Sequence, residues 1–141
     1  MTELVFKLLA MVGFTHPLHP ALTHIPMGMV MGAFFFGLGG VFLKKPELLK
    51  SATHCVGLGL LFILPTAFAG YLDWQHTYEG KWEMLIVIKM VLAVVITVLM
   101  GIAFQLGRKE ETDPKILLAI YLLCLFCAIG LGFSGGELQY G

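Results

Sequence analysis

Charged residues are scarce in this chain. They make up 13% of its 141 residues, whereas hydrophobic residues make up 58% and the mean hydropathy is +0.88. Soluble domains carry roughly a quarter of their residues as charged side chains. The composition therefore excludes an ordinary soluble domain. The formal net charge is zero, so no excess of positive charge points to a nucleic-acid partner.

Catalytic motifs are also lacking. The sequence contains no phosphate-cradling glycine loop, no Ser/His/Asp pattern and no H-E-x-x-H. Nothing in it indicates a hydrolase or an ATPase, and we expect an electron-transfer or accessory subunit rather than a stand-alone enzyme. The three cysteines, Cys55, Cys124 and Cys127, all fall inside apolar runs, which argues against a secreted disulfide framework. Cys124 and Cys127 form a C-x-x-C inside a span, and we interpret them as small hydrophobic core residues rather than as a redox or metal site.

Long apolar runs dominate what is present. They cover residues 20–43, 48–72, 82–106 and 116–133. Each reaches or approaches the ~20 residues that a helix needs to cross ~30 Å of hydrocarbon. We predict an all-α integral membrane protein, a bundle of four transmembrane helices that forms a single domain over residues 1–141. Residues 2–14 lack a signal-peptide cleavage pattern and predict a short helix lying in the membrane interface.

Basic residues predict the orientation of the chain. They gather in the loops after the first and third spans: Lys44, Lys45, Lys50, Arg108, Lys109 and Lys115. Short basic loops stay cytoplasmic. We therefore expect both termini on the outer, periplasmic side of a bacterial inner membrane, with the lipid bilayer as the first partner.

Histidines concentrate in HPLHPALTHIP, residues 16–26, which runs into the first span. With this orientation His16, His19 and His24 lie at the outer membrane face. Further polar residues reach the same face from other spans: Asp73 and His76 after the second, and Glu137 after the fourth. His54 is the exception, roughly 20 Å deeper than His24 at 1.5 Å per residue. One metal or haem iron could hardly take both, so His54 has another role or none.

Each of these residues also has an ordinary interpretation. A histidine at an interface is often an anchor or part of a turn, but a cluster of ionisable groups at membrane depth is usually functional. His24 is the strongest candidate, because Pro26 disturbs the first turns of its helix. Met27 and Met31 share its helical face. Glycines at 28 and 32 favour close helix packing, with a groove for a planar macrocycle as the alternative.

The remaining charged candidates leave two interpretations open. Asp73 and Glu137 are either solvated at helix ends or orient an imidazole N–H. Lys89 lies about two turns into the third span. It either extends to the outer surface or pairs with an acid, a cofactor carbonyl or a propionate.

Three motifs resemble a known family. H-P-x-x-x-H-x-P (His19, Pro20, His24, Pro26), GYLDWQH closing the second span and GGELQYG near the C-terminus are similar to the bacterial four-helix membrane family named domain of unknown function 2231. Many members resembling it carry a histidine near the start of the third span, where this chain reads KWEMLIVIKM. That role would pass to His76 or His19. The resemblance also implies membrane electron transfer, because some members occur joined to cytochrome-type modules.

The leading functional hypothesis is a b-type cytochrome that holds haem near the outer face. His24 is expected as one axial ligand and His76, in preference to His19, as the other. His19, His16 or Lys89 would contact a propionate. Such a protein would exchange single electrons with a quinol pool, as a homodimer or as a subunit beside other membrane proteins and an outer-face cytochrome. A bound quinone is a further expectation.

Two alternatives stay open. His16, His19, His24, Met27 and Met31 would suit copper, which should need the methionines, whereas haem should not. A structural subunit without a cofactor would use the histidines and the GGELQYG tail only to contact a partner.

Overall fold

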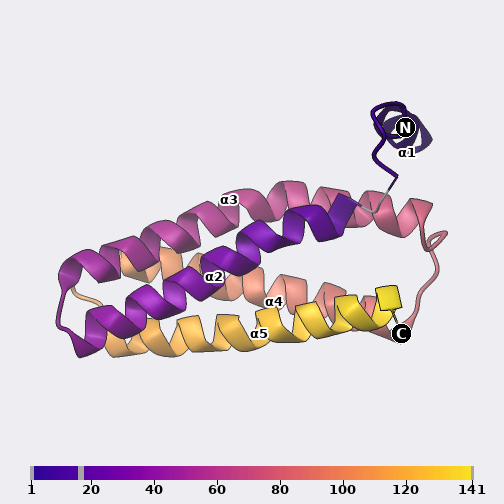
Figure 1. Cartoon of the computed structure of the whole chain (residues 1–141). Coiled ribbons are helices and arrows are strands. Elements are labelled where there is room, and N and C mark those ends of the chain that lie inside the picture. Colours follow the sequence, from indigo (N-terminus) through magenta and orange to yellow (C-terminus); the bar gives the residue numbers. More distant parts are fainter. Residues whose placement is uncertain (1, 16–17, 141) are drawn as a thin grey trace.

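The described part of the chain folds into five helices. The computed structural model describes residues 2–15 and 18–140, with the side chains of residues 138–140 left undescribed. The helices are α1 (Thr2–Met11), α2 (Leu18–Phe42), α3 (Pro46–His76), α4 (Met84–Gly107) and α5 (Pro114–Tyr140). Figure 1 shows α2 to α5 side by side as a long bundle, with both chain ends at the same end of it.

Four of these helices, α2 to α5, are long and apolar enough to cross a membrane. They form a ring in which α2 packs on α3, α3 on α4, α4 on α5 and α5 on α2. The two hairpins, α2–α3 and α4–α5, have the most extensive packing, and α3 against α4 the least. The predicted all-α membrane bundle with a short N-terminal helix is confirmed.

The two ends of the bundle differ in the residues they carry. The polar end is where α2 begins and α3 ends, and the basic end holds the α2–α3 and α4–α5 loops (Figure 1). At the basic end, α3 begins with Pro46, and α5 with Pro114. Proline suits a first helical position, because its fixed backbone is helical and its missing N–H would have no partner there.

Glycines bring α2 close to its neighbours in the basic half of the bundle. A Cβ on Gly37 would stand 2.8 Å from the Tyr121 ring of α5, and one on Gly40 would stand 2.7 Å from the Leu49 side chain of α3. Gly28 has open space instead. Close packing through small residues, expected around residues 28 and 32, is therefore tightest nearer the basic end.

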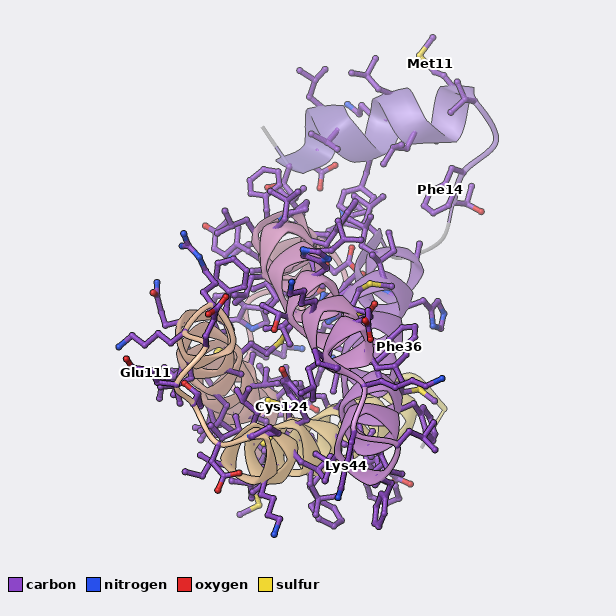
Figure 2. All side chains as sticks on the ribbon, turned by 90° about the vertical axis from the view of Figure 1, so that its left-hand side faces the viewer. Met11, Phe14, Phe36, Lys44, Glu111 and Cys124 are labelled. Carbon is purple, nitrogen blue, oxygen red and sulfur yellow. The ribbon has the colours of Figure 1, made fainter. Side chains whose placement is uncertain are left out.

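Helix α1 lies across the polar end, transverse to the bundle (Figures 1 and 2). In Figure 2 Met11 points away from the bundle, and its side chain is 82% exposed. Leu4, Leu8 and Val12 are exposed as well. This exposed apolar surface suits the interfacial position predicted for the segment, since such a helix buries one face in the head-group region.

Candidate functional site

Asp73 joins α3 to the start of α2 at the polar end. Its Oδ1 accepts the backbone N–H of Leu18 at 3.0 Å, and its Oδ2 accepts that of His19 at 2.7 Å. The first N–H groups of a helix have no partner within the helix, and a carboxylate both satisfies them and suits the positive end of the helix dipole. Asp73 is only 4% exposed. It therefore fixes where α2 begins and how α2 sits against α3.

Helix α3 continues past Asp73 to His76, further than the sequence predicted. The backbone carbonyl of Asp73 accepts the N–H of Thr77 at 2.7 Å, so the helical bonding pattern extends through this segment. An acidic residue was expected to mark the helix end. It lies inside the helix because its carboxylate is satisfied by the neighbouring helix rather than by water.

His19 is held in one orientation by a backbone carbonyl. Its Nδ1 lies 3.0 Å from the carbonyl oxygen of Thr66. A carbonyl oxygen only accepts, so this bond places the proton of the neutral ring on Nδ1 and leaves Nε2 with a free lone pair. Gly70 allows the approach, because a Cβ there would stand 2.8 Å from His19 Nδ1.

Pro26 contributes to the same region. It lies buried inside α2 and has no N–H, so the carbonyl of Leu22 lacks its helical donor. Thr66 Oγ1 lies 3.5 Å from that carbonyl oxygen and 2.7 Å from the carbonyl oxygen of Phe62, to which it donates more strongly. The proline expected to disturb the first turns of the helix that carries His24 thus affects the packing around Thr66 and His19.

Lys89 enters the cluster from α4. Its side chain is half-buried, and its Nζ lies 3.7 Å from where a Cβ on Gly135 of α5 would stand. It lies within electrostatic range of both Asp73 and His19. None of the ion pairs among the described residues includes Lys89. The structure therefore leaves this ammonium between helices without an acid in contact.

Tyr78 borders the cluster from the loop after α3. Burial raises the pKa of its phenol, and the negative charges of Asp73 and Glu83 raise it further. The phenol thus stays neutral, and able to donate, to a higher pH than a free tyrosine.

We define the polar-end cluster as His19, Thr66, Asp73 and Lys89.

His24 and His76 lie away from this cluster and from each other. His24 is exposed on α2. The His76 ring stacks on Phe6 of α1 at 3.9 Å between centroids, and its Nδ1 lies 3.4 Å from Glu3 Oε1.

The levels of these two histidines follow from the contact between Leu22 and Thr66. His24 is two residues beyond Leu22 in α2, and His76 is ten beyond Thr66 in the antiparallel direction. They therefore differ by about 18 Å along the bundle at ~1.5 Å per residue. Two axial ligands of one haem iron bind opposite faces of a single macrocycle. Within one chain the geometry does not favour this pair.

The other predicted residues are dispersed. Glu137 is exposed near the end of α5, and His54 is exposed on α3 toward the basic end. Met27 packs toward Gly132 of α5, whereas Met31 is 49% exposed. His16 lies outside the described residues. Within residues 2–15 and 18–140, no three His, Cys, Asp or Glu side chains gather as a metal site would need.

Two parts of the site were not predicted. The Thr66 carbonyl is a backbone group, so its side-chain identity gives no sign of the role. Gly70 was noted only as the first residue of GYLDWQH. A glycine one helical turn before a buried acid is compatible with close approach of another side chain, which is the one signal the sequence offers.

The comparisons with known proteins support the family resemblance. The family model described as "Predicted membrane protein (DUF2231)" matches residues 15–141. No curated protein and no solved structure matches the chain. The matched segment begins just before α2 and includes all four spans and every member of the polar-end cluster. The chain belongs to the DUF2231 family of predicted membrane proteins.

Proposed function

We propose that the chain is a membrane electron-transfer subunit that binds a quinone or quinol head group at its polar end. The observation that carries the proposal is the fixed His19 imidazole, whose Nε2 is free to accept a hydrogen bond. Its counterpart is the half-buried Lys89 ammonium on α4. Ionisable groups at membrane depth are costly and are usually kept for function.

The two groups suit the chemistry of this ligand. A quinol carries two hydroxyl groups on opposite sides of an apolar ring, so one can donate to His19 Nε2 while the other accepts from Lys89 Nζ. On oxidation a quinol loses two protons and two electrons. His19 would take one proton, the second would leave to water at the membrane surface, and Lys89 would hold the oxygen opposite His19. Electrons would pass to a redox centre in a partner protein, in keeping with the electron transfer implied by the family resemblance.

The position of the cluster supports a ligand that arrives from the membrane. His19 is the second residue of α2, Asp73 lies in the last turn of α3, and Lys89 lies in the second turn of α4. All three are thus within a few residues of the helix ends, near the depth where an amphipathic head group rests while its tail stays in hydrocarbon. Asp73 is fully engaged by α2 and acts as a positioning residue.

Quinone titration tests the proposal. The chain has two tryptophans, Trp74 and Trp82, whose rings meet edge to face beside this end of the bundle with their centroids 4.8 Å apart. Quinones quench indole fluorescence. A benzoquinone with a decyl tail, added to the protein in nanodiscs, should quench saturably. His19→Gln and Lys89→Met should each weaken binding roughly tenfold, the effect of one lost hydrogen bond to a charged or fixed partner.

The matched controls are His24→Gln and His54→Gln, which replace exposed histidines on α2 and α3. Both should bind like the unaltered chain. Non-saturable quenching, or equal weakening by all four substitutions, would contradict a quinone site and favour a structural subunit.

Haem remains a second candidate because of the same histidine. An imidazole whose Nδ1–H is held by a backbone carbonyl is oriented as metal-binding histidines are. In this version His19 replaces His24 as one axial ligand, Lys89 holds a propionate and a second copy or a partner supplies the other ligand. A reduced-minus-oxidised absorption spectrum of protein from haem-replete cells distinguishes the two. A sharp alpha band lost in His19→Gln, and not in His24→Gln, would favour haem.

A further inference from the structure

The basic end contains a cavity that the proposed quinone site does not involve. It has a volume of about 290 Å³ and lies between the α2–α3 loop and the start of α5. Its apolar wall includes Val41, Leu49 and Pro114, and its charged residues are Lys44, Lys115 and Asp113. The cavity thus combines an apolar wall with cationic side chains from the α2–α3 loop and the start of α5, which are far apart in sequence.

The charges around this cavity do not cancel. Asp113 Oδ1 accepts the backbone N–H of Lys115 at 3.0 Å, so its carboxylate caps the start of α5. The ion pairs found among the described residues leave out both Lys44 and Lys115. With two lysines and one aspartate in its lining, the cavity has a net charge of +1, which an anion would neutralise.

The surroundings indicate an anion that carries hydrocarbon. Phe42 and Leu43 precede the cavity residue Lys44, and Ile116 follows Lys115; their side chains are 75%, 61% and 53% exposed. They stand at the end of apolar helices, where a bilayer meets water. A soluble anion would gain nothing from them, whereas acyl chains would cover them.

We propose that this cavity binds the phosphate head group of an anionic phospholipid. Lys44 and Lys115 contact the phosphate, and the acyl chains lie over Phe42, Leu43 and Ile116. Basic pockets between membrane helices on the cytoplasmic side bind such head groups, and these loops are the ones predicted to be cytoplasmic. Figure 2, which views the bundle from the basic end, shows Lys44 at its edge rather than within it.

Lys44 offers an additional way to test this site. Its backbone φ is +52°, in the left-handed region that glycine tolerates best. The position follows the end of α2, where Lys45 N–H bonds the carbonyl of Gly40 at 3.1 Å, and glycine is the usual residue there. Lys44→Gly should therefore relieve backbone strain while removing the charge.

The experiment uses the full chain in nanodiscs of phosphatidylcholine with increasing phosphatidylglycerol. Thermal unfolding gives the stabilisation, and native mass spectrometry gives the bound lipid. The double substitution Lys44→Gln/Lys115→Gln should weaken phosphatidylglycerol binding roughly thirtyfold. Each lysine near an anionic surface strengthens binding roughly fivefold, and the two effects multiply. Lys50→Gln/Lys109→Gln, which removes the same charge outside the cavity, should retain the binding.

Lys44→Gly should unfold at a higher temperature than the unaltered chain in pure phosphatidylcholine, yet respond less to phosphatidylglycerol. Three results would overturn the proposal. They are an equal loss in the control pair, an unchanged response in the cavity pair, and stabilisation by inorganic phosphate alone in phosphatidylcholine that matches phosphatidylglycerol. The last would assign the cavity to free phosphate.

Discussion

The two ends of the bundle hold their charges in different ways. At the polar end, backbone groups fix both Asp73 and His19, and Lys89 is half-buried beside α5. At the basic end, Lys44 and Lys115 stand exposed around an open cavity. Fixed, half-buried groups recognise a ligand by the direction of its hydrogen bonds, whereas mobile exposed cations recognise charge. The polar end is therefore the better candidate for chemistry, and the basic end for attachment to lipid.

The largest expected difference between the ends concerns their acidic helix caps. Asp73→Ala leaves two partly buried N–H groups of α2 without an acceptor and should lower the free energy of unfolding by about 2–3 kcal/mol. Asp113→Ala removes an exposed cap from α5 and should cost about 1 kcal/mol. Denaturant unfolding in detergent micelles measures both. Equal losses would mean that Asp73 is no more than an ordinary cap.

Gly70→Ala should have the next largest effect. The added methyl group would stand 2.8 Å from His19 Nδ1, so the imidazole must move away from the Thr66 carbonyl. We expect a loss of about 1–2 kcal/mol in unfolding free energy, together with weaker quinone binding. The control is Gly28→Ala, where a Cβ meets nothing within 4 Å, and which should be neutral or slightly stabilising. If Gly70→Ala and Gly28→Ala had the same unfolding free energy and quinone affinity, the orientation of His19 would not depend on Gly70.

Lys89→Met should separate binding from stability. Methionine keeps the length of the side chain but removes a half-buried charge that has no acid in contact. The unfolding free energy should stay equal or rise by about 1 kcal/mol, while quinone affinity falls. Parallel unfolding and titration measurements on one preparation make this comparison. A loss of stability would instead assign Lys89 a structural ion-pairing role with Asp73.

The smallest effect is expected at His24. Its exposed side chain should tolerate glutamine within about 0.5 kcal/mol of unfolding free energy, with unchanged ligand binding. The same titration and unfolding measurements apply. A strong loss of binding in His24→Gln would restore His24 as the leading ligand and place the site on the outer surface of α2.

The sequence predicts the membrane helices well, because each is a local property of one apolar run. Which of His19 and His24 faces the polar-end cluster is not a local property of the sequence. It depends on how α2 is rotated against α3, and Asp73, more than fifty residues away from Leu18, sets that rotation through the first N–H groups of α2. No periodicity within residues 16–26 contains this information. The Thr66 carbonyl, which orients the imidazole, belongs to the backbone and leaves no pattern in the sequence.

The basic end shows the same limit. The gathering of lysines and arginine in two loops was plain from the sequence and predicted an orientation. Which of them surround one cavity depends on how the α2–α3 loop approaches the start of α5. The left-handed backbone of Lys44 is part of that approach, and a lysine is not the residue from which such a conformation would be predicted.

The most direct test of the central claim is a ¹⁵N spectrum of histidine-labelled protein in nanodiscs, with the His19 signals assigned by their absence in His19→Gln. Nitrogen shifts distinguish a protonated from an unprotonated ring nitrogen. We predict a neutral His19 with its proton on Nδ1, and a change in the Nε2 shift when decyl-quinol is added, while the shifts of His24 and His54 stay constant. A proton on Nε2, or a quinol-induced change at His24 with none at His19, would contradict it.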